Sequence, residues 1–141
     1  MSIKAILQGR DDTVHALSAE TSVADAIAAL AAKRIGAMPV LDGGKVVGIF
    51  SERDVIHGLA GERDAFLSKP VSAVMITPVI TVSPDTAVLT ALSMMTRRRV
   101  RHLPVLDGDA MVGFVSIGDL VKFRIDRIEA EAAAMRDYIA S

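Results

Sequence analysis

Hydrophobic and polar residues follow a helical pattern shortly after residue 20. Thr21 and Ser22 are residue types that cap helix N-termini, and apolar positions after them recur at i, i+3, i+4 and i+7. This spacing places apolar side chains on one face of a helix. The face residues are Val23, Ala26, Ile27 and Leu30. We therefore expect an amphipathic helix packed on a core.

The pattern then changes to two short apolar runs, 38–41 and 45–50, on either side of Asp42-Gly43-Gly44. An Asp-Gly pair between apolar runs is a strong hairpin signal, because glycine accepts the positive φ that such turns require. Ser51 follows the second run and opens a further helical segment. This stretch predicts a β-hairpin that leads into a helix.

The same plan returns when the chain is shifted by 65 residues, which aligns residues 14–54 with residues 79–119. Fifteen of the forty-one aligned pairs are identical. Asp85-Thr86 takes the place of the first helix cap, and apolar runs at 103–106 and 111–115 flank Asp107-Gly108. The chain therefore contains two copies of one unit.

Each unit is predicted to have the order β-α-β-β-α, with leading strands at 13–15 and 77–80. A unit this small rarely holds a sufficient core alone. Two copies packed face to face would form one α/β (α+β) module with approximate twofold symmetry.

The repeats are placed at residues 8–65 and 71–125, with 126–141 as a C-terminal helix extension. Between the repeats, Gly58, Gly61 and Pro70 predict a polar connector without regular structure.

The last segment keeps a helical pattern from Ile117 to the end of the chain, without Pro or Gly after Gly118. Apolar residues there alternate at spacings of four and three, the a/d pattern of a helix that pairs with another helix. They are Val121, Ile125, Ile128, Ala132, Met135 and Ile139. The stripe either packs on the chain's own domain, against Ile3, Ile6 and Leu7, or pairs with another subunit. We favour the second interpretation and expect a homodimer, with this helix also available to a protein partner.

Composition narrows the class of protein. Hydrophobic residues make up 51% of the chain and charged residues 23%, which suits a globular domain, and five aromatics without Trp predict an aliphatic core. The absence of cysteine excludes disulfides, Cys-ligated zinc and a Cys nucleophile. No apolar run approaches the roughly 18–20 residues of a membrane span. We expect a cytosolic (cytoplasmic) protein without membrane association.

The repeated motifs resemble a pair of CBS domains, also called a Bateman module. The first copy is carried by Pro39-Val40, Asp42, Val47-Gly48, Ser51 and Asp54. The second is carried by Pro104-Val105, Asp107, Val112-Gly113, Ser116 and Asp119. The resemblance spans about residues 8–125, and two copies at one spacing make it specific.

This resemblance implies a regulatory module that senses adenine nucleotides: AMP, ADP or ATP, and in some members NAD or S-adenosylmethionine. Such pairs are usually appended to an enzyme, channel or transporter, and this chain resembles a stand-alone version. We expect the ligand to bind between the repeats and to change their packing or the oligomer contacts. The alternative is a structural or protein-interaction scaffold with vestigial clefts.

Ser51 with Asp54, and Ser116 with Asp119, stand where a strand passes into a helix. The first amides of a helix and its dipole favour an anion there, and a carboxylate one turn later has two acceptor oxygens for ribose hydroxyls. The resemblance implies a ribose role for each Asp and a phosphate-side role for each Ser. Ser-x-x-Asp is equally a near capping box, which stabilises a helix start without any ligand.

Basic residues differ between the repeats. Arg101-His102 precede the second motif proline, where relatives contact ligand phosphates, whereas Gly36-Ala37 occupy the same place in the first copy. The clefts should therefore differ, and the pattern leaves open which cleft Arg101 and His102 serve. Arg53 beside Ser51 is a further candidate.

A denser basic cluster occurs at Arg97, Arg98, Arg99 and Arg101. The cluster indicates either a solvent-exposed helix C-terminus or a group of residues that contact phosphate. A nucleic-acid surface is the least favoured interpretation, because the net charge is −1 and stacking aromatics are absent.

The resemblance places adenine contacts on the leading strands. For the second site these are Thr77, Val79 and Ile80; for the first, Thr13 and His15 are weaker candidates. The three His residues have no ligand-spaced neighbours, and no metalloprotease, P-loop or nucleophile-elbow motif occurs. We therefore expect neither a bound metal nor an enzyme.

Overall fold

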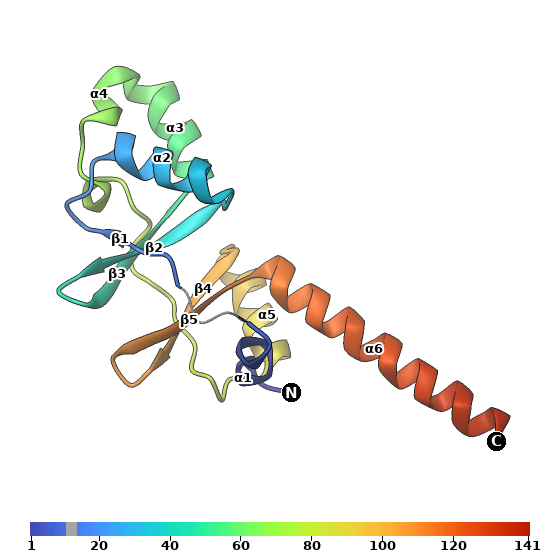
Figure 1. The fold of residues 1–141 in the computed structure, drawn as a ribbon. Helices are drawn as coiled ribbons and strands as arrows, with labels where there is room; N and C mark the ends of the chain where they lie inside the picture. The colour runs from blue at the N-terminus through green and yellow to red at the C-terminus, as the bar shows by residue number, and fades with distance from the viewer. Residues whose placement is uncertain (11–13) are drawn as a thin grey trace.

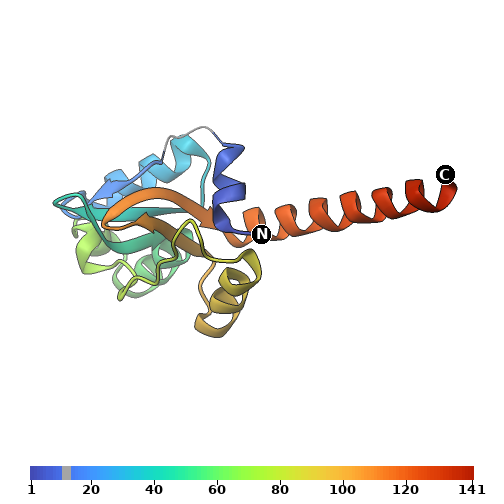
Figure 2. The same ribbon diagram turned by 90° about the horizontal axis from the view of Figure 1, so that it is seen from below.

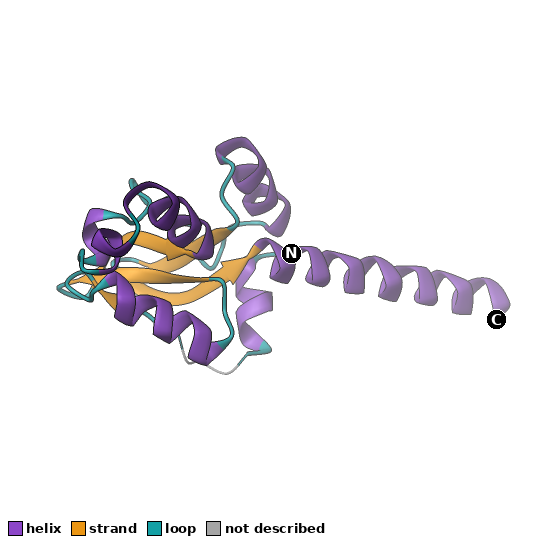
Figure 3. Cartoon of the chain, turned by 90° about the horizontal axis from the view of Figure 1, so that it is seen from above, coloured by secondary structure: helices purple, strands orange, loops and turns teal. Residues whose placement is uncertain are grey.

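Two small sheets form the centre of the molecule. The structure, a computed structural model, describes residues 1–10 and 14–141. The first repeat contributes a sheet of order β1 (Leu17–Ser18), β2 (Ala37–Asp42) and β3 (Lys45–Ser51), and the second contributes β4 (His102–Asp107) and β5 (Ala110–Ser116). Helices surround these strands, as Figure 3 shows.

The helices follow the strands in the predicted order. The main ones are α2 (Val23–Lys33), α3 (Glu52–Glu62), α5 (Val88–Arg98) and α6 (Ile117–Ala140). Shorter helical segments are α1 (Ile3–Gln8), α4 (Asp64–Leu67) and the 3-10 turn η1 (Val71–Ala73). Figure 1 shows the two repeats one above the other, with α6 extending away from both.

The two hairpins have equivalent geometry. Each is antiparallel, and the register shifts once, between Val40 and Leu41 in the first and between Val105 and Leu106 in the second. Gly43 and Gly108 both adopt positive φ in the turns, as the Asp-Gly signal requires. The tandem architecture expected from the 65-residue shift is confirmed.

Each repeat has its own core, and a segment from outside the repeat motif completes it. The first core includes Phe66 from the connector and Val71 from the start of the second repeat, and with Phe50 it is not purely aliphatic as the composition suggested. The second core takes in Ile3 and Ile6 of α1. The N-terminal helix therefore serves the repeat that is more distant in sequence.

The predicted leading strands are misplaced by about three residues. In the first repeat the parallel strand is Leu17–Ser18 rather than 13–15, and Thr13 lies outside the described residues. In the second repeat the equivalent pairing is a single bridge from Val82 to Val105, and residues 77–80 form no strand. Leu17 and Val82, which hold these ladder positions, are both buried.

The helix cap expected at Asp85-Thr86 is also wrong. Ser22 caps α2 as predicted and accepts a hydrogen bond from the Asp25 amide, but the N-cap of α5 is Ala87. Thr86 instead accepts a hydrogen bond from the Ser83 amide, which stabilises the preceding turn. The Thr86 hydroxyl thus bonds the backbone of the preceding turn and does not cap the helix.

The unstructured connector predicted around Gly58 is helical. Helix α3 continues through Gly58 and Gly61, and α4 follows it. A Cβ on Gly58 would lie 2.0 Å from the Phe66 ring, so the glycine permits the ring to pack against α3. Phe66 is almost fully buried, and this packing makes the segment part of the first core.

None of the helices in the described ranges, 1–10 and 14–141, is long and apolar enough to cross a bilayer.

Candidate functional site

Two cavities lie between the repeats. The larger has a volume of about 460 Å³ and the smaller about 160 Å³. Gly36 and His102 line both. The larger cavity combines Ser116 and Asp119, at the start of α6, with His15 and Ala37 of the first repeat. The two repeats therefore build each cavity together.

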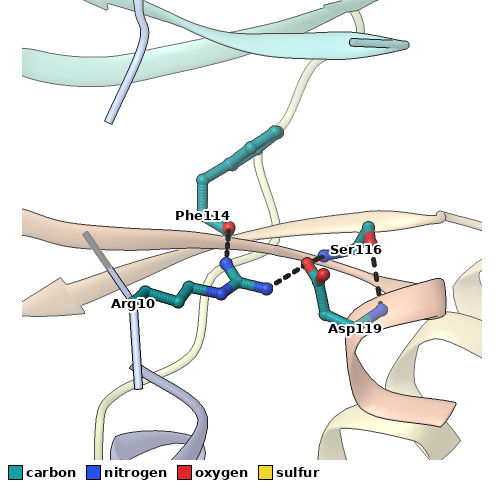
Figure 4. Close-up of polar contacts among 4 residues, drawn as sticks. All are labelled: Arg10, Phe114, Ser116 and Asp119. Carbon is teal, nitrogen blue, oxygen red and sulfur yellow. Dashed lines mark hydrogen bonds and ion pairs between the residues drawn. The ribbon is translucent and has the colours of Figure 1, made fainter. Parts of the chain in front are cut away.

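Asp119 is held from two sides in the larger cavity. Its Oδ2 accepts a hydrogen bond from the Ser116 amide at 2.7 Å, and Ser116 Oγ accepts one from the Asp119 amide at 3.1 Å. Arg10 Nη2 lies 2.6 Å from the same Oδ2, while Arg10 Nη1 donates to the Phe114 carbonyl at 3.1 Å (Figure 4). About a third of the Arg10 and Asp119 side chains remains exposed, so the pair is accessible from the cavity.

This environment keeps Asp119 ionised. Burial acts to raise the pKa of the carboxyl, but the Ser116 hydrogen bonds and the Arg10 guanidinium outweigh it and lower the pKa below the ordinary Asp value. A carboxylate in this state offers acceptor oxygens to hydroxyl donors.

His102 stands between the cavities. Its ring stacks on Phe114, with ring centroids 5.4 Å apart and nearly parallel planes. Burial lowers the pKa of His102, against the opposing effect of Asp119. The imidazole is therefore neutral at neutral pH, where it presents one donor and one acceptor.

The smaller cavity collects basic side chains from both repeats. Ser51 and Arg53 of the first repeat line it with Arg99, Arg101 and His102 of the second, and Glu52 adds a carboxylate. The basic residues before the second motif proline therefore face the Ser51 cavity, and His102 also faces the other one. Arg97 and Arg98 lie exposed in the last turn of α5.

Asp54 does not line the smaller cavity. Its Oδ2 accepts hydrogen bonds from the Ser51 amide at 2.8 Å and from Ser51 Oγ at 3.1 Å. Burial raises the pKa of Asp54, and the bonds from Ser51 offset this only in part. In this repeat the Ser-x-x-Asp motif is satisfied as a helix cap.

The residues predicted to contact the base are arranged differently from expectation. Thr77, Val79 and Ile80 line neither cavity, and Ile80 packs on the second core. Ile76 lines the smaller cavity and pairs with Ile49. His15 lies at the larger cavity with Asp119, so the segment leading into the first repeat faces the second repeat's aspartate.

Arg10 is the site residue that sequence reasoning missed. It precedes the repeated motif, and the 65-residue shift pairs it with Met75. Comparison of the two repeats therefore gives no signal at Arg10. Its position after α1, whose apolar residues anchor in the second core, brings it to Asp119.

Comparisons with known proteins identify the family. A family model described as CBS domain matches residues 10–61 and again residues 71–126. The chain belongs to the CBS-domain family, as a tandem pair. Among curated relatives, the CBS domain-containing protein CBSX3, mitochondrial, of Arabidopsis thaliana is 33% identical over 92% of this chain and 61% of its own length. This chain therefore spans less than two thirds of that relative.

Solved structures share the fold. The CBS-domain containing protein ATU1752 from Agrobacterium tumefaciens superimposes with a TM-score of 0.83 at 34% identity, covering 88% of this chain and 99% of that one. The CBS domain pair of protein MJ0100, in complex with 5′-methylthioadenosine and S-adenosyl-L-methionine, has a TM-score of 0.79 at 25% identity, covering 90% and 98%.

Proposed function

We propose that this chain is a regulatory module that binds an adenosine-containing ligand in the larger cavity and signals through helix α6. The observation that carries the proposal is the placement of an ionised, partly accessible Asp119 in a cavity of about 460 Å³ at the start of that helix. The volume lies within the range of small-molecule sites, roughly 300–1,000 Å³.

The lining supports this class of ligand. Apolar groups such as Val14, Ile35 and Val112 offer a surface for a base, while Asp119 supplies acceptors for ribose hydroxyls. The MJ0100 domain pair was solved with two ligands that both contain adenosine. Arg10 and the N-terminus of α6 add positive character, which favours a ligand with a phosphate: AMP, ADP, ATP or NAD.

The proposed binding site adjoins helix α6, through which the signal is proposed to pass. Asp119 lies in the first turn of α6, and Leu120 beside it is fully buried in the second core. A ligand that takes over the Asp119 oxygens must change their contact with Arg10, which comes from the N-terminal segment. The ligand shifts the packing only through unequal affinity for the two arrangements.

A scaffold without ligand is the second candidate, and it fits the first repeat. The smaller cavity holds only about 160 Å³, and Asp54 does not line it. We therefore assign ligand binding to the larger cavity and not to both.

Thermal unfolding of the full chain with and without millimolar AMP, ADP, ATP, NAD and S-adenosylmethionine tests the proposal. A ligand that binds only the folded state adds about 2.7 kcal/mol at one hundred times its Kd. We expect a shift with at least one of them that Asp119→Ala removes. Asp126→Ala, an exposed position on the same helix, is the matched control and should keep the shift. No shift with any of the five would favour the scaffold.

A further inference from the structure

Most of helix α6 stands clear of the rest of the chain. It has 24 residues and is therefore about 36 Å long. Among the described residues, its N-terminal turns contact the body of the molecule: Leu120 is buried and Phe123 packs on the second core. Figure 2 shows the remainder projecting away from both repeats.

The side of α6 that faces its own core is not the side that carries the apolar stripe. With the stripe at heptad positions a and d, Leu120 falls at c and Phe123 at f, on the opposite face. The stripe stays exposed, from 42% at Val121 through 49% at Ile128 to 74% at Ile139. Packing on the chain's own domain, the first of the two sequence interpretations, is therefore wrong for this stripe.

Charged residues border the stripe on both sides. The e positions are Lys122, Glu129 and Arg136, and the g positions are Arg124, Glu131 and Tyr138. In a parallel, in-register pair of helices, each g residue meets the e residue five positions further along the partner. Arg124 then meets Glu129 of the partner subunit, and Glu131 meets Arg136 of the partner subunit. Twofold symmetry repeats each contact, so all four carry opposite charges.

In an antiparallel pair of α6 helices with full overlap, the flanking contacts join like charges instead. Antiparallel packing sets e against e and g against g, and the layer that joins Ile128 to Ala132 of the partner subunit gives the longest overlap. Glu129 and Glu131 then each face their own copies, and Lys122 faces Arg136 of the partner subunit. These contacts bring like charges together, which selects against the arrangement.

From this charge complementarity we propose that α6 pairs with α6 of a second copy as a parallel, in-register, two-stranded coiled coil. The stripe is two residues wide and charged on both edges, which fits a single partner helix. Because the core-facing side lies opposite the stripe, both globular modules fit outside the coil at its N-terminal end. This pairing does not depend on the ligand proposal.

Cysteine cross-linking tests the orientation, since the chain has no cysteine of its own. Met135→Cys places two thiols at the same d layer of a parallel pair, within reach of a disulfide. We expect mild oxidation to convert most of this variant to a covalent dimer. Ala130→Cys, at f on the outer face, is the matched control and should stay uncross-linked. Failure of Met135→Cys to cross-link above that control would overturn the parallel register.

Sedimentation of the full chain at tens of micromolar tests the charge pairs. We expect twice the 14.9 kDa chain mass for the wild type, and about tenfold weaker association for Arg136→Glu, which then faces Glu131 of the partner subunit. Exchange of both charges, Glu131→Arg with Arg136→Glu, should restore it, and Asp137→Arg at position f should leave it unchanged.

Three other outcomes would contradict the proposed parallel two-stranded coil. An antiparallel pair would associate more tightly after Arg136→Glu, because Lys122 then gains a carboxylate partner. A monomeric wild type would exclude the coil. Three copies, which β-branched residues at the d positions Val121 and Ile128 favour in isolation, would exclude the two-stranded form.

Discussion

The two repeats share a backbone plan but not the chemistry of their aspartates. Asp54 and Asp119 occupy equivalent first turns, and Ser51 and Ser116 bond them through equivalent amides. Only Asp119 has the Arg10 guanidinium beside it. Beside the first repeat's hairpin, Met75 packs over Gly48, as Leu7 packs over the equivalent Gly113 of the second. The repeat thus fixes where each carboxylate stands, while the segments outside it decide what each carboxylate is able to bind.

The sharpest test of this difference replaces each aspartate by alanine. Loss of a charged acceptor from a ligand site typically costs 1.5–3 kcal/mol, so Asp119→Ala should weaken nucleotide binding by about 10- to 150-fold. Asp54→Ala should leave the affinity within about twofold. Titration calorimetry with the ligand found by thermal unfolding measures both.

The same two variants separate binding from capping. Each removes an N3 carboxylate that bonds its N-cap amide, so both should lose about 0.5–2 kcal/mol of unfolding free energy in urea. Equal losses of affinity in the two variants would show that the repeats do not differ in function.

The second contrast concerns the helices that follow the two hairpins. Helix α3 ends at Glu62, where its C-cap Arg63 has positive φ, and Phe66 packs back onto it, whereas α6 continues outward. Gly58→Ala inserts a methyl group into the Phe66 ring and should cost about 1–3 kcal/mol of stability. Gly61→Ala in the same helix meets open space and should stabilise by up to about 1 kcal/mol. Urea unfolding decides, and equal effects would mean that Phe66 does not pack there.

The sequence predicted well those features that local chemistry determines. The hairpins formed at Asp42-Gly43 and Asp107-Gly108, because positive φ is set within the turn. The sequence predicts a break around Gly58, because glycine disfavours helices locally. The tertiary contact with Phe66 overrode that tendency. Arg10 was missed for a similar reason: its partner lies 109 positions away, and only the packing of α1 brings them together.

Arg10 lines the larger cavity and pairs with Asp119. Arg10→Ala removes both the partner of Asp119 and a cation from the larger cavity. We expect affinity for AMP to fall by about three- to tenfold, since a phosphate loses a charge-assisted partner. Affinity for uncharged 5′-methylthioadenosine should be unchanged or higher, because Asp119 no longer has to leave Arg10.

Lys4→Ala, an exposed cation on α1, is the control for the change in net charge. An equal loss of affinity for both ligands in Arg10→Ala would mean that Arg10 supports the cavity and does not select the ligand.

The smallest effect is expected from His102 of β4, which faces both cavities. Its burial lowers the pKa in the folded state, so at mildly acidic pH the unfolded chain binds a proton that the native chain resists. Its contribution to stability is therefore complete above the unfolded pKa of about 6.5 and is lost as the pH falls through the lower folded value. Compared with His102→Gln, the wild type should lose stability progressively between pH 7.5 and pH 5.5, as urea unfolding at each pH would measure. If the stability of the two proteins had the same pH dependence, protonation of His102 would not lower the free energy of unfolding. Solvent in the cavities would then be enough to stabilise the charge.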